Sequence, residues 1–317
     1  MRKRVLVTAM SFRRSKEALA LLEDNGCEVI VSPYNRALQE AEMLDLIKGV
    51  SAIVAGNDAL TEKVIAAGMP VLEIIARSGA GYNTIDITAA RRFGVPVTNT
   101  PGANTRSVAD LTVGLMISLA RNITRLNQSL HAGNWEKSVG GELGEKTLGV
   151  VGTGNIGGEV IKRAVAFDMK IVAFDIYPRR DLVEKYGVIY LPLKEVIAQA
   201  DFLSLHVPVI PETINLINKA TLPLMKPTAY LINTARGELV VEEDLGNALK
   251  QGVIAGAALD VFNKEPLQDS SLNNLPTAIL TPHIGASTRE ASDRVGIMAA
   301  EEVIRVLSGA APRYPVN

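Results

Sequence analysis

Three ionisable residues, Arg236, Glu265 and His283, each follow a short apolar run and could together act on a small acid. Histidine titrates near neutral pH and is the usual proton shuttle in enzymes. A guanidinium group binds a carboxylate through two parallel hydrogen bonds and can polarise a neighbouring carbonyl. If the apolar runs are parallel strands, their carboxyl ends meet at one edge of a sheet, where α/β proteins bind ligands. Taken singly, Arg236 and Glu265 also fit a surface ion pair, and His283 fits a structural histidine.

The other histidines and the single cysteine are weaker candidates. His131 lies in a polar segment typical of the protein surface, and His206 ends an apolar run, as a partly buried structural histidine would. Cys27 stands alone, which excludes a disulfide within the chain and a zinc site of several thiolates. We expect Cys27 to be a small buried residue, and we expect no metal site.

A glycine pattern after another apolar run predicts a dinucleotide site. Residues 147–158 read TLGVVGTGNIGG, in which Gly152, Gly154 and Gly157 form G-x-G-x-x-G. The first glycine permits a tight turn, the second lets the backbone approach a pyrophosphate, and the third lets helix and strand pack closely. The N-terminus of the following helix then attracts the phosphates. A glycine-rich turn without a ligand is the alternative interpretation.

An acidic residue supports the dinucleotide interpretation. Asp175 ends the next apolar run, 18 residues after Gly157, at the spacing of an acid that binds the adenosine ribose. A carboxylate repels a 2′-phosphate, so Asp175 favours NAD over NADP. Arg179 and Arg180 lie close by and weaken this preference without reversing it.

Apolar runs alternate with helical patterns along the chain, which predicts an α/β fold of parallel strands joined by helical crossovers. The strands expected are Arg4–Thr8, Glu28–Val31, Ala52–Ala55, Leu72–Ala76, Pro96–Thr98, Thr147–Val151, Lys170–Asp175, Phe202–His206, Ala229–Asn233, Ile254–Asp260 and Ala278–Thr281. The helices expected are Lys16–Asn25, Gln39–Lys48, Thr61–Ala67, Asp86–Phe93, 104–125, Asn155–Phe167, Leu193–Gln199, Glu242–Lys250 and Arg289–Leu307. We place the first domain boundary near Thr100.

Size and charge bound the function. The 317 residues suffice for about two domains of ~150 residues each. Lys and Arg number 33 and Asp and Glu 34, and this balance argues against a nucleic-acid-binding protein. No apolar stretch approaches the ~20 residues of a membrane span, and the run Val5–Val7 is too short for a signal peptide. We expect a cytoplasmic protein that binds neither nucleic acid nor membrane.

Several segments resemble the D-isomer-specific 2-hydroxyacid dehydrogenase family, above all its phosphoglycerate dehydrogenases. They are GTGNIGG at 152–158, LHVP at 205–208, LMKPTAYLINTARGELV at 224–240, ALDVFNKEP at 258–266, TPHIGAST at 281–288, and 76–116. This resemblance covers almost the whole chain and rests on several independent motifs, so it is more specific than the glycine pattern alone.

The resemblance implies a role for each candidate residue. His283 would be the general acid/base that protonates the 2-oxo oxygen, and Glu265 would hold its imidazole and favour the protonated form. Arg236 would bind the substrate carboxylate. The backbone of the other domain would bind the same carboxylate through Ser78, Gly79, Ala80 and Gly81.

The family's cofactor is NAD, and the resemblance implies which residues hold it. The pyrophosphate would lie over Asn155 and Ile156, and the ribose on Asp175. The nicotinamide end would lie near Val207, Thr234 and Asp260, with Asp260 accepting a hydrogen bond from the carboxamide. The remaining members of the expected cofactor set are Ala235, Gly285 and Ala286.

The resemblance also implies two Rossmann-like or flavodoxin-like domains, each a parallel sheet flanked by helices, with a cleft between them. Residues 1–99 and 288–317 would form the catalytic domain, and 100–287 the NAD-binding domain. The helix at 104–125 would connect the domains and contribute to a homodimer interface. Trp135, in the loop after it, would reach the partner subunit or pack locally.

Two departures from the phosphoglycerate dehydrogenases bear on the substrate. Ala55 stands where they usually carry an arginine that helps with the phosphorylated substrate; Arg13 and Arg14 could meet that phosphate instead, or be two solvated arginines. The chain ends at Asn317 without a regulatory domain, so we expect no feedback through one.

Three functions stay open. The first is D-3-phosphoglycerate dehydrogenase activity, which converts 3-phosphoglycerate to 3-phosphohydroxypyruvate in serine biosynthesis. The second is a hydroxypyruvate or glyoxylate reductase, or another D-2-hydroxyacid dehydrogenase, with the same catalytic residues. The third is an NAD-sensing scaffold like the corepressors that resemble this family, which would bind NADH and hardly consume it.

Overall fold

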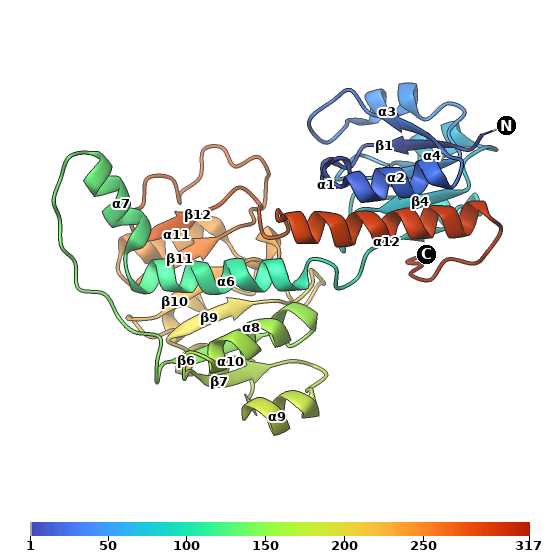
Figure 1. Cartoon of the computed structure of the whole chain (residues 1–317). Helices are drawn as coiled ribbons and strands as arrows, with labels where there is room; N and C mark the ends of the chain where they lie inside the picture. The colour runs from blue at the N-terminus through green and yellow to red at the C-terminus, as the bar shows by residue number, and fades with distance from the viewer. Residues whose placement is uncertain (1) are drawn as a thin grey trace. The chain divides into compact units, whose positions relative to one another are not determined.

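A computed structural model describes residues 2–317, and the chain divides into two compact units (Figure 1). The first unit holds the residues up to Asn104 together with Ala286–Asn317, and the second holds Thr105–Gly285. Each unit contains one parallel sheet flanked by helices, which confirms the predicted α/β class. No helix within residues 2–317 is long and apolar enough to cross a membrane.

The first unit has a five-stranded sheet in the order β2-β1-β3-β4-β5, and all neighbouring strands are parallel. This is the strand order of flavodoxin-like folds. The strands are β1 (Arg4–Val7), β2 (Glu28–Val31), β3 (Ala52–Ala55), β4 (Ile74–Arg77) and β5 (Val97–Thr98).

Helices cover both faces of this sheet because the central strands are buried on both sides. The helices are α1 (Met10–Arg14), α2 (Lys16–Asp24), α3 (Glu40–Leu46), α4 (Glu62–Gly68), α5 (Ile87–Arg92) and α12 (Arg289–Leu307). One face packs against α2 and α12, whose Leu22 and Val303 join Val5 and Val7 in a single core. Figure 1 shows α12 alongside α2 although they lie at opposite ends of the sequence.

The residues after α12 return to the edge of this sheet. The backbone of Val316 donates to Val97 at 2.8 Å, and that of Asn99 donates to Tyr314 at 3.2 Å. Glu302 of α12 is buried, and its carboxylate accepts hydrogen bonds from the amides of Arg313 and Tyr314. The sequence pattern predicted none of these contacts, because they join residues that are far apart in the chain.

The second unit has a seven-stranded parallel sheet in the order β12-β11-β10-β9-β6-β7-β8. Its strand order reverses between β6 and β9, as in Rossmann folds, and ligands bind beyond the carboxyl ends of the strands at such a point. The strands are β6 (Thr147–Val151), β7 (Lys170–Phe174), β8 (Ile189–Tyr190), β9 (Phe202–Leu205), β10 (Tyr230–Asn233), β11 (Gly256–Leu259) and β12 (Ala278–Leu280).

Two hydrophobic cores lie on the two faces of this second sheet. One contains residues of α6 and α8, and the other contains residues of α10 and α11. The helices are α6 (Thr105–Ala120), α7 (Ile123–His131), α8 (Asn155–Val165), α9 (Arg180–Tyr186), α10 (Leu193–Gln199) and α11 (Glu242–Lys250), with short 3₁₀ turns at Leu222–Leu224 and Gly237–Leu239.

The prediction of one helix over 104–125 was wrong. α6 ends at Ala120, and Asn122 adopts a left-handed conformation (φ 53°) that breaks the helix before α7 begins. His131 therefore ends a helix instead of lying in a loop. Trp135 follows in an irregular segment with 82% of its surface exposed, so it does not pack locally.

Candidate active site

The predicted catalytic and cofactor residues of the second unit lie at the carboxyl ends of its strands. The residues that follow or end these strands are Gly152 (β6), Asp175 (β7), His206 and Val207 (β9), Thr234 and Arg236 (β10), Asp260 (β11) and His283 (β12). Since all the strands are parallel, these residues share one edge of the sheet.

Glu265 and His283 form a direct pair. Oε2 of Glu265 lies 2.7 Å from Nδ1 of His283, and Oε1 accepts a hydrogen bond from the amide of Phe262 at 3.1 Å. Burial raises the pKa of Glu265, but the hydrogen bond and charge of His283, the Phe262 amide and the charge of Arg236 together bring it below its ordinary value. Glu265 is therefore a carboxylate that accepts a hydrogen bond from Nδ1–H, which leaves Nε2 of His283 for proton transfer.

A buried carboxylate fixes the loop that carries His283. Asp260 is 1% exposed, and its oxygens accept hydrogen bonds from the hydroxyl of Thr281 (2.5 Å) and the amides of Ile284 (2.8 Å) and Gly285 (2.7 Å). His283 itself has φ 51°, a left-handed conformation that is costly for a non-glycine residue. We infer that Asp260 holds His283 in this conformation. Its expected bond to the nicotinamide carboxamide stays a prediction.

The Arg236 loop lies directly on the Glu265 loop. A Cβ atom at Gly237 would lie 2.0 Å from the carbonyl carbon of Phe262, so only glycine allows this approach. Asn233 is fully buried and bonds the loop on both sides: its Nδ2 donates to the Arg236 carbonyl at 2.8 Å, and its Oδ1 accepts from the Ala235 amide at 3.1 Å.

The guanidinium of Arg236 keeps most of its donors free. It donates one hydrogen bond, to the carbonyl of Ala235 at 2.6 Å, and pairs with no acid within residues 2–317. Its charge is close enough to lower the pKa of Glu265. The predicted trio of Arg236, Glu265 and His283 is thus brought together on neighbouring loops.

The glycine loop has the geometry of a dinucleotide site. Gly152 adopts φ 95°, and a Cβ atom at Gly157 would lie 2.0 Å from the Gly152 carbonyl oxygen, so both positions need glycine. A Cβ atom at Gly154 would meet nothing within 4 Å, which leaves room for a ligand. No side chain caps the N-terminus of α8, which begins at Asn155 with Ile156 and no acidic residue in its first turn. These residues fit the pyrophosphate of NAD.

Asp175 ties the glycine loop to β7. Its Oδ2 accepts from the Thr153 amide at 2.6 Å, and its Oδ1 accepts from the Tyr177 amide at 2.8 Å. Arg179 is engaged by Asp181 at 2.6 Å. Arg180 is exposed and pairs with no acid within residues 2–317, so the preference for NAD over NADP stays a prediction.

His206 lies beside the glycine loop, and only one of its two ring nitrogens has a hydrogen-bond partner. Its Nε2 lies 2.8 Å from the hydroxyl of Ser204, whereas its buried Nδ1 has no partner within residues 2–317. Burial lowers the pKa of His206 to about 3, so the ring is neutral at physiological pH. The side chain of Val207 lies against Gly152, and Thr234 shares a hydrogen bond of 2.9 Å with Thr112 of α6. Ala235 and Gly285 belong to the loops already described, and Ala286 begins the last segment of the first unit.

In the first unit, the predicted carboxylate-binding turn Ser78–Gly81 follows β4. The Arg77 side chain donates to the carbonyls of Ser78 (2.8 Å) and Gly81 (2.7 Å), and Gly79 has φ 148°. The amides of Ala80 and Gly81 donate to no residue of 2–317, so they are available to an anion. Sequence reasoning missed Arg77, although its place at a strand end was a usable signal.

Arg13 and Arg14 have different surroundings in the structure. Both lie in α1; Arg13 donates to Oδ1 of Asn35 at 3.3 Å, and Arg14 is exposed. At the Ala55 turn a guanidinium is present after all, because Nη1 of Arg77 on the neighbouring strand lies 3.3 Å from the Ala55 carbonyl.

Comparisons with known proteins agree with this geometry. Residues 113–285 match the NAD binding domain of the D-isomer specific 2-hydroxyacid dehydrogenases. The D-3-phosphoglycerate dehydrogenase of Synechocystis is 43% identical over 88% of this chain and 51% of its own length. The chain thus spans about half the length of the curated phosphoglycerate dehydrogenases it matches. The hydroxypyruvate reductase of Thermotoga maritima is 42% identical over 92% of this chain and 95% of its own length.

A solved structure extends the match to the whole fold. The D-lactate dehydrogenase of Aquifex aeolicus, determined with NAD and lactic acid, is 29% identical and superposes with a TM-score of 0.84 over 96% of both chains. The predicted family and the predicted cofactor, NAD, are therefore confirmed. The chain belongs to the D-isomer specific 2-hydroxyacid dehydrogenase family.

Proposed function

We propose that this protein is an NAD-dependent dehydrogenase of D-2-hydroxy acids, with 3-phosphoglycerate and 3-phosphohydroxypyruvate as its substrate pair. The observation that carries the proposal is the 2.7 Å contact between Glu265 and His283, at the same sheet edge as the glycine loop. A proton shuttle beside a dinucleotide site suits the interconversion of an alcohol and a ketone.

The acid–base step follows from the protonation of His283. In reduction of the 2-oxo acid, Nδ1–H donates to the Glu265 carboxylate while Nε2–H gives its proton to the carbonyl oxygen. In oxidation of the hydroxy acid, Nε2 takes the hydroxyl proton and Glu265 stabilises the imidazolium that forms. Asp260 keeps the ring in place throughout, because it bonds the backbone on the C-terminal side of His283.

Arg236 binds and orients the acid. Its free donors can hold the substrate carboxylate through two parallel hydrogen bonds and polarise the adjacent carbonyl. The free amides of Ala80 and Gly81 offer a second carboxylate site. When bound, NAD supplies the acceptor for the hydride of the hydroxy acid.

A second substrate is supported by a specific observation. The chain matches the Thermotoga hydroxypyruvate reductase over almost that protein's full length and at nearly the same identity as the phosphoglycerate dehydrogenases. Reduction of hydroxypyruvate or glyoxylate would use the same Arg236, Glu265 and His283. What differs between the two functions is whether the protein recognises a phosphate.

The first experiment is therefore NADH consumption by purified protein with 3-phosphohydroxypyruvate, hydroxypyruvate, glyoxylate, pyruvate and a branched-chain 2-oxo acid. We expect the highest kcat/KM for 3-phosphohydroxypyruvate and slower turnover with NADPH. Preference for an unphosphorylated acid would replace the substrate and keep the mechanism. An NADH-binding protein without turnover on any of these acids would be a scaffold, and the proposal would be wrong.

We further propose that the protein is a cytoplasmic homodimer. The apolar side chains left exposed on α7 and the segment after it support the dimer; they are Ile123, Leu130, Trp135 and Val139. The measurement of association is described in the Discussion.

A further inference from the structure

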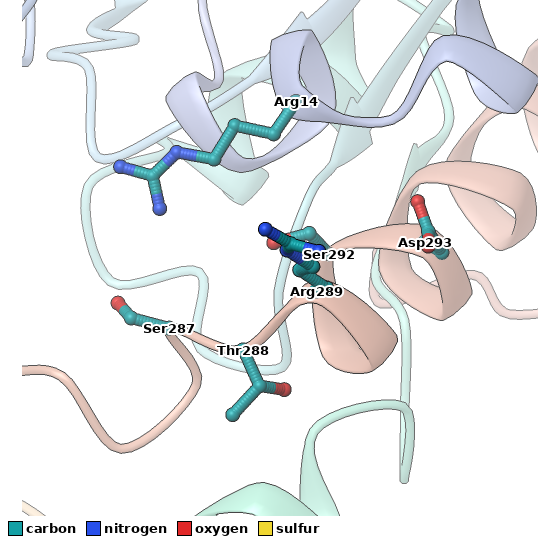
Figure 2. A pocket seen from close by; sticks show the side chains of 6 residues that line it. All are labelled: Arg14, Ser287, Thr288, Arg289, Ser292 and Asp293. Atoms are coloured by element: carbon teal, nitrogen blue, oxygen red, sulfur yellow. The ribbon is translucent and has the colours of Figure 1, made fainter.

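A cavity of about 420 Å³, lined by polar and charged residues, lies in the first unit, where the loop that carries His283 leads into α12 (Figure 2). It is lined by Arg14, Ser287, Thr288, Arg289, Ser292 and Asp293. Its volume falls within the range of small-molecule sites. Arg14 comes from the end of α1, and the other residues surround the N-terminus of α12.

Two guanidinium groups line this cavity without a partner. Neither the Arg14 guanidinium nor that of Arg289 forms an ion pair or a hydrogen bond with any residue of 2–317. Two cations on one cavity repel each other, and an anion between them removes this repulsion. Asp293 also lines the cavity, but it pairs with neither arginine, and in Figure 2 its carboxyl group does not point toward the Arg14 guanidinium.

The hydroxyl of a largely buried serine faces the cavity and supports a ligand site independently of the charges. Ser292 is only 4% exposed, yet its hydroxyl lines the cavity and has no hydrogen-bond partner within residues 2–317. This hydroxyl is open to the cavity and can donate a hydrogen bond to a ligand held there.

The N-terminus of α12 adds a favourable potential. This helix has 19 residues, and the side chain of its N-cap Thr288 accepts a hydrogen bond from the Ala291 amide at 3.1 Å. The partial positive charge of the helix N-terminus favours an anion at the cavity.

We propose that this cavity binds the phosphate group of a small phosphorylated metabolite. Two guanidinium groups match the charge of a phosphate monoester dianion and its several acceptor oxygens. The hydroxyl of Ser292 donates a further hydrogen bond. A carboxylate is a poorer fit, because it has a single charge and only two oxygens for this larger set of donors.

The phosphate could belong to the substrate or to a separate ligand. Oγ of Ser11 lies 3.0 Å from Oγ of Ser78, so α1 contacts the proposed carboxylate-binding turn, and Arg14 lies about one helical turn beyond Ser11. Helix α1 thus contacts that turn and also supplies a cavity residue, so the phosphate of a phosphorylated 2-hydroxy acid held at the turn is the occupant we assign to the cavity. This assignment to the substrate rests on the proposed function, whereas the anion site itself does not.

The anion site is tested by titrating inorganic phosphate into the whole protein and measuring binding by calorimetry and ³¹P NMR. We expect binding in the millimolar range that the double variant Arg14→Gln, Arg289→Gln weakens by about tenfold or more. Ser292→Ala should weaken it less, and Arg91→Gln, an exposed arginine on α5, should leave it unchanged. Equal phosphate affinity in the wild type and the double variant, or no binding by the wild type, would overturn the proposal.

Kinetics then identify the source of the phosphate. If the substrate carries it, the double variant raises KM for 3-phosphohydroxypyruvate by at least about tenfold and leaves KM for hydroxypyruvate unchanged. If both KM values stay unchanged while phosphate binding is lost, the cavity serves a separate phosphorylated ligand. Phosphate binding in a protein that turns over no 2-oxo acid would support the site and refute only the proposed activity.

Discussion

At the scale of single residues, the proton-transfer pair is held by its backbone as much as by its side chains. His283 adopts a left-handed conformation, and the buried carboxylate of Asp260 bonds the amides of the next two residues. Strain of this kind costs about 1–3 kcal/mol and persists only where the surroundings enforce it. The pairing of the imidazole with Glu265 therefore depends on a carboxylate that does not contact the ring.

Replacing His283 by Asn should separate chemistry from cofactor binding. Asn tolerates the left-handed conformation and removes the proton shuttle. We expect kcat to fall by about 10²–10⁴, with NADH affinity almost unchanged in a fluorescence titration. His131→Asn, at the exposed end of α7, is the matched control. Full activity of His283→Asn would refute the role of His283.

His206 should make the stability of the protein depend on pH. Burial lowers its pKa to about 3, so below its ordinary value of 6.5 only the unfolded chain binds the proton. The free energy of unfolding should fall through this contribution by about 1.4 kcal/mol per pH unit as pH falls from 6.5 towards 3. His206→Gln should remove this dependence while keeping a donor near Ser204.

Urea unfolding at several pH values between neutrality and the acid range measures this effect. The slope of unfolding free energy against pH should be smaller for His206→Gln than for the wild type, and His131→Gln should show the wild-type slope. Equal slopes for all three proteins would mean that His206 is protonated in the folded state.

At the scale of elements, the glycine loop must let β6 pack closely on α8 and must also leave space for the cofactor. Substitutions at two different glycines can test these requirements separately. A methyl group at Gly157 would collide with the backbone of Gly152, whereas one at Gly154 would enter open space in front of α8. Gly157→Ala therefore tests how β6 packs on α8. Gly154→Ala tests whether that open space holds the cofactor.

We expect Gly154→Ala to change the unfolding free energy by less than about 0.5 kcal/mol and to weaken NADH binding by about tenfold or more. Gly157→Ala should lower the unfolding free energy by about 1–3 kcal/mol, because backbone atoms must move. Thermal unfolding and NADH titration of both variants are the measurements. Unchanged NADH affinity in Gly154→Ala would place the pyrophosphate elsewhere.

The periodicity of apolar residues predicted the bounds of the last helix. The short helix α1 and the break at Asn122 depend on local geometry that periodicity does not reveal. The last helix has the predicted bounds, Arg289–Leu307, because its apolar face repeats over five turns. α1 has only five residues and no side-chain cap, so no periodic signal marks it. The break at Asn122 depends on one left-handed residue, which the surrounding helical pattern conceals.

The sequence predicted those site residues that come directly after a strand. Arg236, Glu265 and His283 each follow a recognisable apolar run, and the structure gathers them. Asp260 and Arg77 also end or follow strands. Their side chains form hydrogen bonds with backbone amides and carbonyls, and the sequence does not reveal such bonds.

At the scale of the whole molecule, alternation of strands and helices predicts parallel sheets but not their strand order. Both sheets reverse their strand order between adjacent central strands, at β1/β3 in the first unit and at β6/β9 in the second. The G-x-G-x-x-G loop lies at the reversal of the second unit, between β6 and α8. The cofactor chemistry of the second unit therefore follows from topology together with one motif. The first unit closes its core with α12, the helix most distant in sequence from its first strand.

The exposed apolar side chains around α7 lead to a last prediction about assembly. Trp135 is the only tryptophan and is 82% exposed in the single chain, and Leu130 of α7 is 56% exposed. Burying such side chains against a second copy is favourable by about 25 cal/mol per Å² of apolar surface. As protein concentration rises, the Trp135 emission should move to shorter wavelength while sedimentation shows a monomer become a dimer. Leu130→Asp should shift both transitions to higher concentration, whereas Arg91→Gln should not. A monomer with solvent-exposed emission at all concentrations would mean that this surface does not pair with itself.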